Sequence, residues 1–316
     1  MKKLRVFQKV NQRKTVQVFP KGGTGTVFLL FLFLPCLISF LFGNGHKEDE
    51  ASALVTHLQT GNIPVVNQTM LGREEIPLEI YVADKLARCM DEAYEIEALK
   101  AQAVLIRTNL IKEGGESIYV EDDLYGDKEI PLSCYQAAAE TKGLILEYKG
   151  KPVYAPYFKS SSGYTREAKE SLPGEEHSYL TGVPCGKDYL ACGYHTTVIY
   201  GKETFEDLWK QLMKLPKKEQ KEEDFTCIRD SAGYVLEMNY GGEWAVGEEI
   251  RYLYHLPSAD FRVFWEGREI VFEVTGQGHG FGMSQFTANE MAKEGQDFLA
   301  ILNYFFKETE LTKIER

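Results

Sequence analysis

The sequence predicts an α+β fold, a single mixed domain in which β-hairpins surround one central helix. Helix-like and strand-like segments are interspersed, and short turns join the strands instead of the regular crossovers of a parallel sheet. Residues 95–110 have apolar side chains at helical spacing and several alanines, which predicts a buried helix. Residues 276–285 place four glycines between a strand-like and a helix-like segment, a pattern typical of a binding loop.

The N-terminal region predicts one transmembrane helix ahead of this domain. Residues 1–26 contain seven basic and no acidic residues, and residues 27–43 form an uncharged apolar run. Such a run is just long enough to span a bilayer, and its basic flank keeps the N-terminus in the cytoplasm. A cleaved signal peptide is the alternative, but no small-x-small cleavage site is evident. We therefore expect a single-pass anchor in the cell membrane, a linker at 44–61 and an extracytoplasmic domain at 62–316.

Charge and cysteine content exclude several classes of protein. The chain has 36 basic and 47 acidic residues, and the basic N-terminus makes the remainder still more acidic. An acidic domain repels phosphate backbones, so nucleic acid is not an expected partner. Five cysteines lie outside the apolar run, and an odd number cannot all pair within the chain. The sequence is therefore not that of a disulfide-dense scaffold.

The remaining elements follow from turn residues and apolar periodicity. The central helix has a buried stripe of Ile96, Leu99, Ala103, Ile106 and Leu110. In the first half of the chain, we predict a hairpin of 63–66 and 75–82 leading into a helix, the helix at 95–110, a hairpin of 143–148 and 152–158, and a hydroxyl-rich loop at 160–165. A helix at 205–215, a solvated charged loop at 217–224 and a strand at 234–239 follow. The last predicted elements are a short helix at 246–256, strands at 261–265 and 269–274, and a helix at 285–293.

Two places combine residues suited to chemistry. Glu97 is a carboxylate at the start of a helix that must be buried, although a helical Glu97–Lys100 pair is also an ordinary surface ion pair. His279 lies inside the glycine-rich loop, with Ser284 and Gln285 at its exit. A glycine-rich turn with a surface histidine is the simpler interpretation of that loop.

The cysteines near residue 190 leave three possibilities open. Cys185 and Cys192 lie between His177 and His195, a set that can bind zinc. The spacing lacks the short cysteine pairs usual in structural zinc sites, and a local disulfide outside the cytoplasm is favoured. Free thiols are the third possibility. No nucleophile-elbow serine or phosphate-binding loop is present.

Four motifs, taken in order, resemble the stage II sporulation protein D/LytB family from about residue 63 to residue 312. They are EALKAQAV at 97–104 followed by Arg107 and Thr108, SSGYT at 161–165, Arg251 with LPSADF at 256–261, and GHGFGMSQ at 278–285.

The resemblance implies a membrane-anchored protein of endospore-forming bacteria that remodels peptidoglycan during engulfment. It implies a lytic transglycosylase that cleaves glycan strands to 1,6-anhydro-muramic acid ends, preferably strands stripped of stem peptides by a partner amidase. Other members of the family enhance amidases. A cell-wall amidase and other engulfment membrane proteins are thus the implied partners, and no cofactor is implied.

The resemblance also assigns roles to residues. One carboxyl group can protonate the glycosidic oxygen and then remove the proton of the C6 hydroxyl that closes the anhydro ring, and we expect Glu97 to do this. The implied substrate-binding residues are His279, Ser284, Gln285, Gly278 and Gly280 on one wall, Ser161, Ser162 and Thr165 on the opposite wall, and Lys100 and Arg107 on the helix.

The sequence departs from the family pattern in two places. Enzymatic members carry another glutamate eight positions before the equivalent of Glu97, but this chain has Cys89 there, followed by Met90 and Asp91. Either Glu97 or a neighbouring acid (Asp91, Glu92 or Glu95) supplies the proton, or the protein is a non-catalytic glycan-binding enhancer of an amidase; a Cys89–His279 thiol pair is a third hypothesis. Residues 122–136, where some members bind zinc, contain Cys134 and no histidine, so no metal is expected.

Overall fold

The structure is a computed structural model whose described part lies within one compact unit, Glu50–Arg316. It describes residues 52–59, 63–69, 72–91, 93–114, 118–120, 129–172, 174–213 and 225–314. The predicted cytoplasmic segment 1–26, the predicted anchor 27–43 and the predicted charged loop 217–224 lie outside these residues. Among the described helices, none is both long and apolar enough to cross a membrane.

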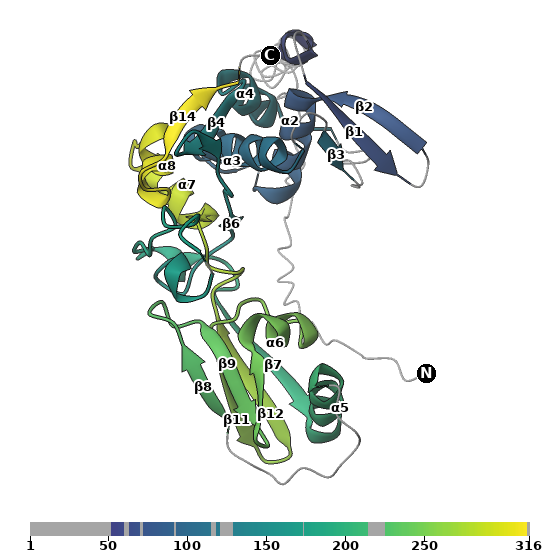
Figure 1. Cartoon of the computed structure of the whole chain (residues 1–316), viewed down its shortest axis with the longest axis vertical. Helices are drawn as coiled ribbons and strands as arrows, with labels where there is room; N and C mark the ends of the chain where they lie inside the picture. The colour runs from purple at the N-terminus through teal and green to yellow at the C-terminus, as the bar shows by residue number, and fades with distance from the viewer. Residues whose placement is uncertain are drawn as a thin grey trace, which may run out of the picture. The chain divides into compact units, whose positions relative to one another are not determined.

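Helices and strands are interspersed along the chain (Figure 1), which confirms the mixed α/β class. The helices are α2 (Leu78–Cys89), α3 (Ile96–Gly114), α4 (Leu132–Glu140), α5 (Lys202–Met213), α6 (Gly247–Leu253), α7 (Gln285–Lys293) and α8 (Phe298–Phe305). The strands are β1 (Pro64–Thr69), β2 (Gly72–Pro77), β3 (Ile118–Val120), β4 (Leu144–Tyr148), β5 (Lys151–Pro152), β6 (Tyr157–Phe158), β7 (His195–Gly201), β8 (Thr226–Arg229), β9 (Val235–Tyr240), β10 (Glu243–Val246), β11 (Phe261–Glu266), β12 (Glu269–Thr275), β13 (Met283–Ser284) and β14 (Glu310–Lys313).

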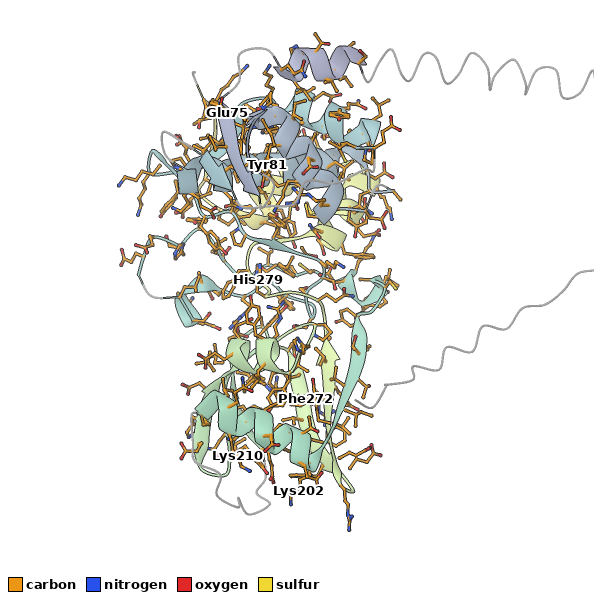
Figure 2. All side chains as sticks on the ribbon, turned by 90° about the vertical axis from the view of Figure 1, so that its right-hand side faces the viewer. Glu75, Tyr81, Lys202, Lys210, Phe272 and His279 are labelled. Carbon is orange, nitrogen blue, oxygen red and sulfur yellow. The ribbon has the colours of Figure 1, made fainter. Side chains whose placement is uncertain are left out.

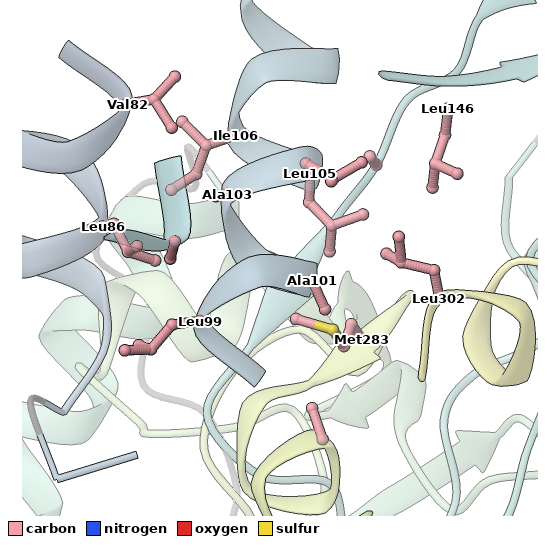
Figure 3. Close-up of a cluster of buried hydrophobic side chains, with 14 of the residues drawn as sticks. Val82, Leu86, Leu99, Ala101, Ala103, Leu105, Ile106, Leu146, Met283 and Leu302 are labelled. Atoms are coloured by element: carbon pink, nitrogen blue, oxygen red, sulfur yellow. The ribbon is translucent and has the colours of Figure 1, made fainter. Parts of the chain in front are cut away.

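Helix α3 is the centre of the first of two hydrophobic clusters, as predicted. Helices α2, α4, α7 and α8 and strand β4 all contact it. In Figure 3 its side chains point toward Val82 and Leu86 of α2 on one side and toward Met283 and Leu302 on the other. The predicted single stripe was therefore too narrow, because this helix is buried on nearly every side. Its alanines permit the close approach of several neighbours at once.

The N-terminal hairpin is confirmed, with one change of boundary. Strand β1 pairs antiparallel with β2 and parallel with β3. Helix α2 begins at Leu78, so residues 78–82, predicted as part of the second strand, are helical. Part of the predicted linker is also ordered, because residues 52–59 form a helix that buries Leu58 in the first cluster.

The second predicted hairpin is shorter than expected. Strand β4 pairs with β5 through a turn at Lys149 and Gly150, whose φ angles are 54° and 72°. Both angles suit a tight hairpin turn. The other side of β4 pairs with β14. Strand β6, predicted as part of the hairpin, instead pairs in parallel with β13 at the end of the glycine-rich loop.

The second hydrophobic cluster is formed by the segment between residues 195 and 275. One sheet has the order β11–β12–β7 and another the order β10–β9–β8, with α5 and α6 packed beside them (Figure 1). Its core is aromatic and includes Phe205, Trp209 and Phe272. The glycine-rich loop connects the two clusters, since β12 belongs to the second cluster and Met283 to the first. In Figure 2 His279 of this loop lies between Tyr81 of the first cluster and Phe272 of the second.

Candidate functional site

The glycine-rich loop runs from the end of β12 to β13, and its shape depends on its glycines. Gly276, Gly278, Gly280 and Gly282 all have positive φ. A Cβ at Gly282 would lie 2.1 Å from the carbonyl oxygen of Pro156, and one at Gly278 would lie 2.4 Å from the Cβ of Phe158. No other residue type fits this approach, since only glycine lacks the Cβ. The loop is thereby pressed against the segment that contains β6.

A groove lies where this loop meets the end of α2 and the start of α7. It consists of two adjoining cavities of about 730 and 460 Å³. Six residues line both: Arg88, Cys89, Lys159, Pro257, Gln277 and Gln285. Of the predicted site residues, His279, Gly278 and Gln285 line the groove. The structure therefore brings the loop and the end of α2 together, although they are about 190 residues apart in the sequence.

The groove is rich in cationic side chains. Arg88, Lys159 and Arg251 line it, and Asp91 is the carboxylate that also lines it. The Arg88 guanidinium is paired with Asp84, and Arg251 lies 3.0 Å from Glu248. Among the described residues, the Lys159 ammonium has no ion-pair partner. A groove of this kind suits an extended polar ligand with negative charges.

Cys89, the last residue of α2, lines both cavities of the groove. Its backbone oxygen accepts a hydrogen bond of 3.1 Å from the Gln285 amide. Burial raises the pKa of the Cys89 thiol to about 12, although a hydrogen bond with Tyr157 and the nearby Lys85 charge oppose the shift. The thiol is thus protonated at neutral pH and is a poor nucleophile. A protonated thiol does not favour the hypothesis of a reactive Cys89–His279 pair.

His279 is held in its neutral form. Burial lowers its pKa to about 4, and the charges of Arg251 and Arg166 act in the same direction. Its Nδ1 accepts a hydrogen bond of 3.1 Å from the backbone N–H of Phe281. The ring proton therefore lies on Nε2. His279 lines the groove as a half-buried neutral ring and is not a fully exposed surface histidine.

The two predicted serines at the ends of the site serve a buried carboxylate instead. Asp188 is completely buried, and its oxygens accept hydrogen bonds from the Ser161 N–H at 2.6 Å and the Ser284 hydroxyl at 2.8 Å. Thr287 adds a third bond of 2.7 Å. Burial raises the pKa of Asp188, and these bonds oppose the shift. Ser284 is also the N-cap of α7, where its oxygen accepts from Thr287 N–H. Neither serine lines the groove.

Arg166 connects the glycine-rich loop to the second cluster. Its Nε donates to Asp230 at 2.6 Å, and its terminal nitrogen donates to the His279 carbonyl at 3.3 Å. Its guanidinium also lies over the ring of Phe281, 4.5 Å from the centroid. The backbone N–H of Arg166 donates to the Gly280 carbonyl, so Gly280 is used in holding the loop. Likewise the Gly278 N–H donates to Pro257, which removes that amide from ligand binding.

Glu97 does not line the groove. One carboxylate oxygen accepts from the Lys100 ammonium at 2.6 Å, and the other accepts from the backbone N–H of Phe298 at 2.9 Å. Lys100 also pairs with Glu140 at 2.5 Å. Burial lowers the pKa of Lys100, but its two carboxylate partners outweigh that effect and raise it. Glu97 and Lys100 thus join the start of α3 to the start of α8 and to α4.

Three other predicted substrate contacts also lie away from the groove. Arg107 is completely buried and makes a two-pronged contact with Glu79, at 2.9 and 2.6 Å. Its partner Glu79 lies in the first turn of α2, which packs against α3. Thr165 is buried and accepts from the Val183 N–H. The Ser162 hydroxyl donates to the carbonyl of Ala232.

The favoured disulfide between Cys185 and Cys192 is not formed. Cys185 is buried in the first cluster and Cys192 is exposed at the edge of the groove. All five cysteines of the described part are free thiols. In that same part, no three histidine, cysteine or acidic side chains gather closely enough to hold a metal ion. Free thiols, the third possibility, are what the structure contains.

Sequence reasoning missed Lys159, Gln277, Asp188 and Arg166. Lys159 and Gln277 lie next to recognised motifs and were detectable by extending those motifs by one or two residues. Asp188 lies between the two cysteines, and Arg166 follows the hydroxyl-rich loop. Their partners are tens of residues away, so no local pattern distinguishes them from surface charges.

Known proteins resemble this chain over most of its length. Residues 66–148 match the family model described as Stage II sporulation protein. The chain is 31% identical to stage II sporulation protein D of Bacillus subtilis (strain 168) over 279 residues, which covers 80% of each protein. It is 28% identical to the protein of the same name from Bacillus amyloliquefaciens, covering 80% of this chain and 79% of that protein. A shorter segment of 101 residues is 33% identical to an amidase enhancer of Bacillus subtilis (strain 168), covering 31% of this chain and 14% of that protein. The chain belongs to the stage II sporulation protein D family.

Proposed function

We propose that this protein takes part in cell-wall remodelling during sporulation, as a glycan-binding partner that enhances a cell-wall amidase. The observation that carries the proposal is the composition of the groove. It has three cationic side chains, while Cys89, which lines both of its cavities, carries a protonated thiol instead of a carboxylate. The groove therefore has the charge to bind a strand, and position 89 supplies no acid to cut it.

The ligand we propose is the glycan strand of peptidoglycan without its stem peptides. Removing the peptide from a muramic acid residue leaves a free lactyl carboxylate at each such sugar. Lys159, which has no ion-pair partner among the described residues, can pair with such a carboxylate. Gln277, Gln285 and the ring of His279 provide polar and flat surfaces for the sugars. An anchor at residues 27–43 would hold this domain outside the cytoplasmic membrane, near the amidase and other engulfment membrane proteins.

The second candidate is a lytic transglycosylase, and Asp91 is the observation that favours it. This exposed carboxylate lines the groove two residues after Cys89. In that mechanism the acid protonates the glycosidic oxygen while the C6 hydroxyl of the muramic acid attacks C1. The same carboxylate then takes the hydroxyl proton, so that no water is consumed. Glu97 is less suited to this role, since both of its oxygens are engaged by protein donors outside the groove.

The test is to incubate the purified full chain with peptide-free glycan strands and to measure strand binding and 1,6-anhydro ends by mass spectrometry. We expect binding without such ends, weaker binding in Lys159→Gln, and a faster partner amidase in the presence of the wild-type chain. Cys89→Glu is expected to produce anhydro ends, and Cys89→Gln is its matched uncharged control.

Three results would overturn the enhancer proposal. Anhydro ends made by the wild-type chain and lost in Asp91→Asn would establish the transglycosylase with Asp91 as its acid. Ends lost instead in Glu97→Gln would assign the acid to α3. A wild-type chain that binds no strand would remove both candidates.

A further inference from the structure

A second cavity lies on the other side of α7, between that helix, α8 and the loop at 184–187. Its volume is about 570 Å³. Helix α7 contributes to both sites, because Gln285 and Phe286 line the groove while Glu290 and Met291 line this cavity. We call it the α7–α8 cavity. Neither the family motifs nor the proposed mechanism uses it.

One wall of the α7–α8 cavity is apolar and fixed. Met291, Ala300 and the ring of Tyr304 are its partly buried apolar members. The Tyr304 hydroxyl donates to the Pro184 carbonyl at 2.5 Å, and this bond holds the ring in place. A ring restrained by such a bond loses less rotamer freedom on binding than an unrestrained ring does.

The polar residues of the same cavity offer hydrogen bonds without net charge. The exposed amides of Gln296 and Asn303 line the cavity, and neither makes a side-chain hydrogen bond within the described residues. The charged groups neutralise one another: Lys187 lies 2.6 Å from Glu294 and 3.6 Å from Glu290. Lys307 stands at one edge with its ammonium 5.5 Å from the centroid of the Tyr304 ring.

We infer that the α7–α8 cavity is a second saccharide subsite, which takes an uncharged N-acetylated amino sugar. The acetamido group of such a sugar combines a methyl group, suited to Met291 and Ala300, with an amide, suited to Gln296 and Asn303. A charged ligand would have to displace the existing ion pairs. The inference rests on the proposed glycan binding and divides the work between the two sites: the cationic groove binds muramic acid carboxylates, and the cavity binds N-acetylglucosamine.

The test is calorimetric titration of the full chain with a tetramer of N-acetylglucosamine, a probe without carboxylates. We expect binding that weakens about five- to tenfold in Gln296→Ala and in Asn303→Ala, the effect of one lost hydrogen bond. Both side chains are exposed and unbonded, so the variants should fold normally. Gln211→Ala, which changes an exposed glutamine of α5 that lines neither site, is the matched control and should bind the tetramer as the wild type does. Lys159→Gln reports whether the tetramer occupies the groove instead.

The possible failures are distinguishable. If peptide-free strands bind but the tetramer does not, the cavity inference fails and the groove proposal stands. If tetramer binding is lost in Lys159→Gln and kept in the cavity variants, the tetramer occupies the groove and the inference is overturned. Binding of a free stem peptide that is lost in Asn303→Ala, with no tetramer binding, would also overturn it by assigning the cavity to peptide. If the strands do not bind but the tetramer does, the groove proposal fails alone.

Discussion

The signature helix and the groove differ in how completely their charged side chains are paired. In and around α3, Arg107 is enclosed with Glu79, and Lys100 is paired with both Glu97 and Glu140. In the groove, Arg88 and Arg251 are paired as well, but the Lys159 ammonium has no ion-pair partner among the described residues. Charges that are paired inside a protein stabilise its fold, while unpaired charges at a cavity are available to a ligand. The difference supports a structural role for the charged residues of α3 and a ligand-binding role for Lys159.

The largest expected effect is that of breaking the scaffold at Arg107. Arg107→Met leaves the buried Glu79 carboxylate without its counter-charge, and we expect a loss of about 3–5 kcal/mol in the free energy of unfolding. Denaturant titration measures this loss. The double variant Arg107→Met with Glu79→Met should recover much of it, because no buried charge remains. If the folded Arg107→Met protein instead loses glycan affinity, α3 is part of the site and the comparison is broken.

In the glycine-rich loop, the titration of His279 should change the free energy of unfolding by about 2–3 kcal/mol as the pH changes. The pKa of His279 is about 4 in the folded protein, below the ordinary value of 6.5. The unfolded chain therefore binds the extra proton first, and stability should fall as the pH falls from about 6.5 toward 4. Unfolding free energies of the wild type and His279→Gln, measured across this range, should diverge, with the variant less sensitive to acid.

The opposite shift at Asp188, whose pKa is raised by burial, is present in both of these proteins and cancels in their difference. Parallel pH curves for the wild type and His279→Gln would contradict the buried neutral state of the histidine.

A smaller loss of stability is expected from glycine substitutions, and comparing two of them separates the cost of backbone strain from the cost of disturbed loop packing. Gly282→Ala places a side chain at positive φ and within 2.1 Å of the Pro156 oxygen, whereas Gly267→Ala, also at positive φ, meets nothing within 4 Å. We expect each to cost about 1–2 kcal/mol from strain, with a further loss of stability and of strand binding for Gly282→Ala alone. Equal stability and binding in the two variants would show that the loop tolerates displacement.

The smallest effect is expected at Glu97. Glu97→Gln keeps an acceptor for the Phe298 N–H and weakens the contact with Lys100, so stability should fall by only about 0.5 kcal/mol. Strand binding and any lytic product should not change. Glu140→Gln, which removes the other partner of Lys100, is the matched control. If Glu97→Gln loses glycan processing and Glu140→Gln does not, Glu97 belongs to the functional site.

The elements themselves were largely predictable. The boundaries of α7 and the course of β12 followed from turn residues and periodicity, which are local properties of the chain. The site was predictable only where residues belong to one motif: His279, Gly278 and Gln285 line the groove together. Ser161 and Ser284 were assigned to the ligand from the family resemblance, but the buried Asp188 accepts from the Ser161 backbone N–H and the Ser284 hydroxyl.

The sequence by itself determined the family motifs, the central helix, the glycine-rich loop and the unexpected cysteine at position 89, since each is a property of residues close together in the chain. Only the tertiary structure decided that Cys89, His279 and Gln285 line one groove while Glu97 and Arg107 are held away from it. The physical reason is that burial and ion pairing depend on partners distant in sequence. Glu97 meets the Phe298 N–H, and Arg107 meets Glu79, only after the helices have packed.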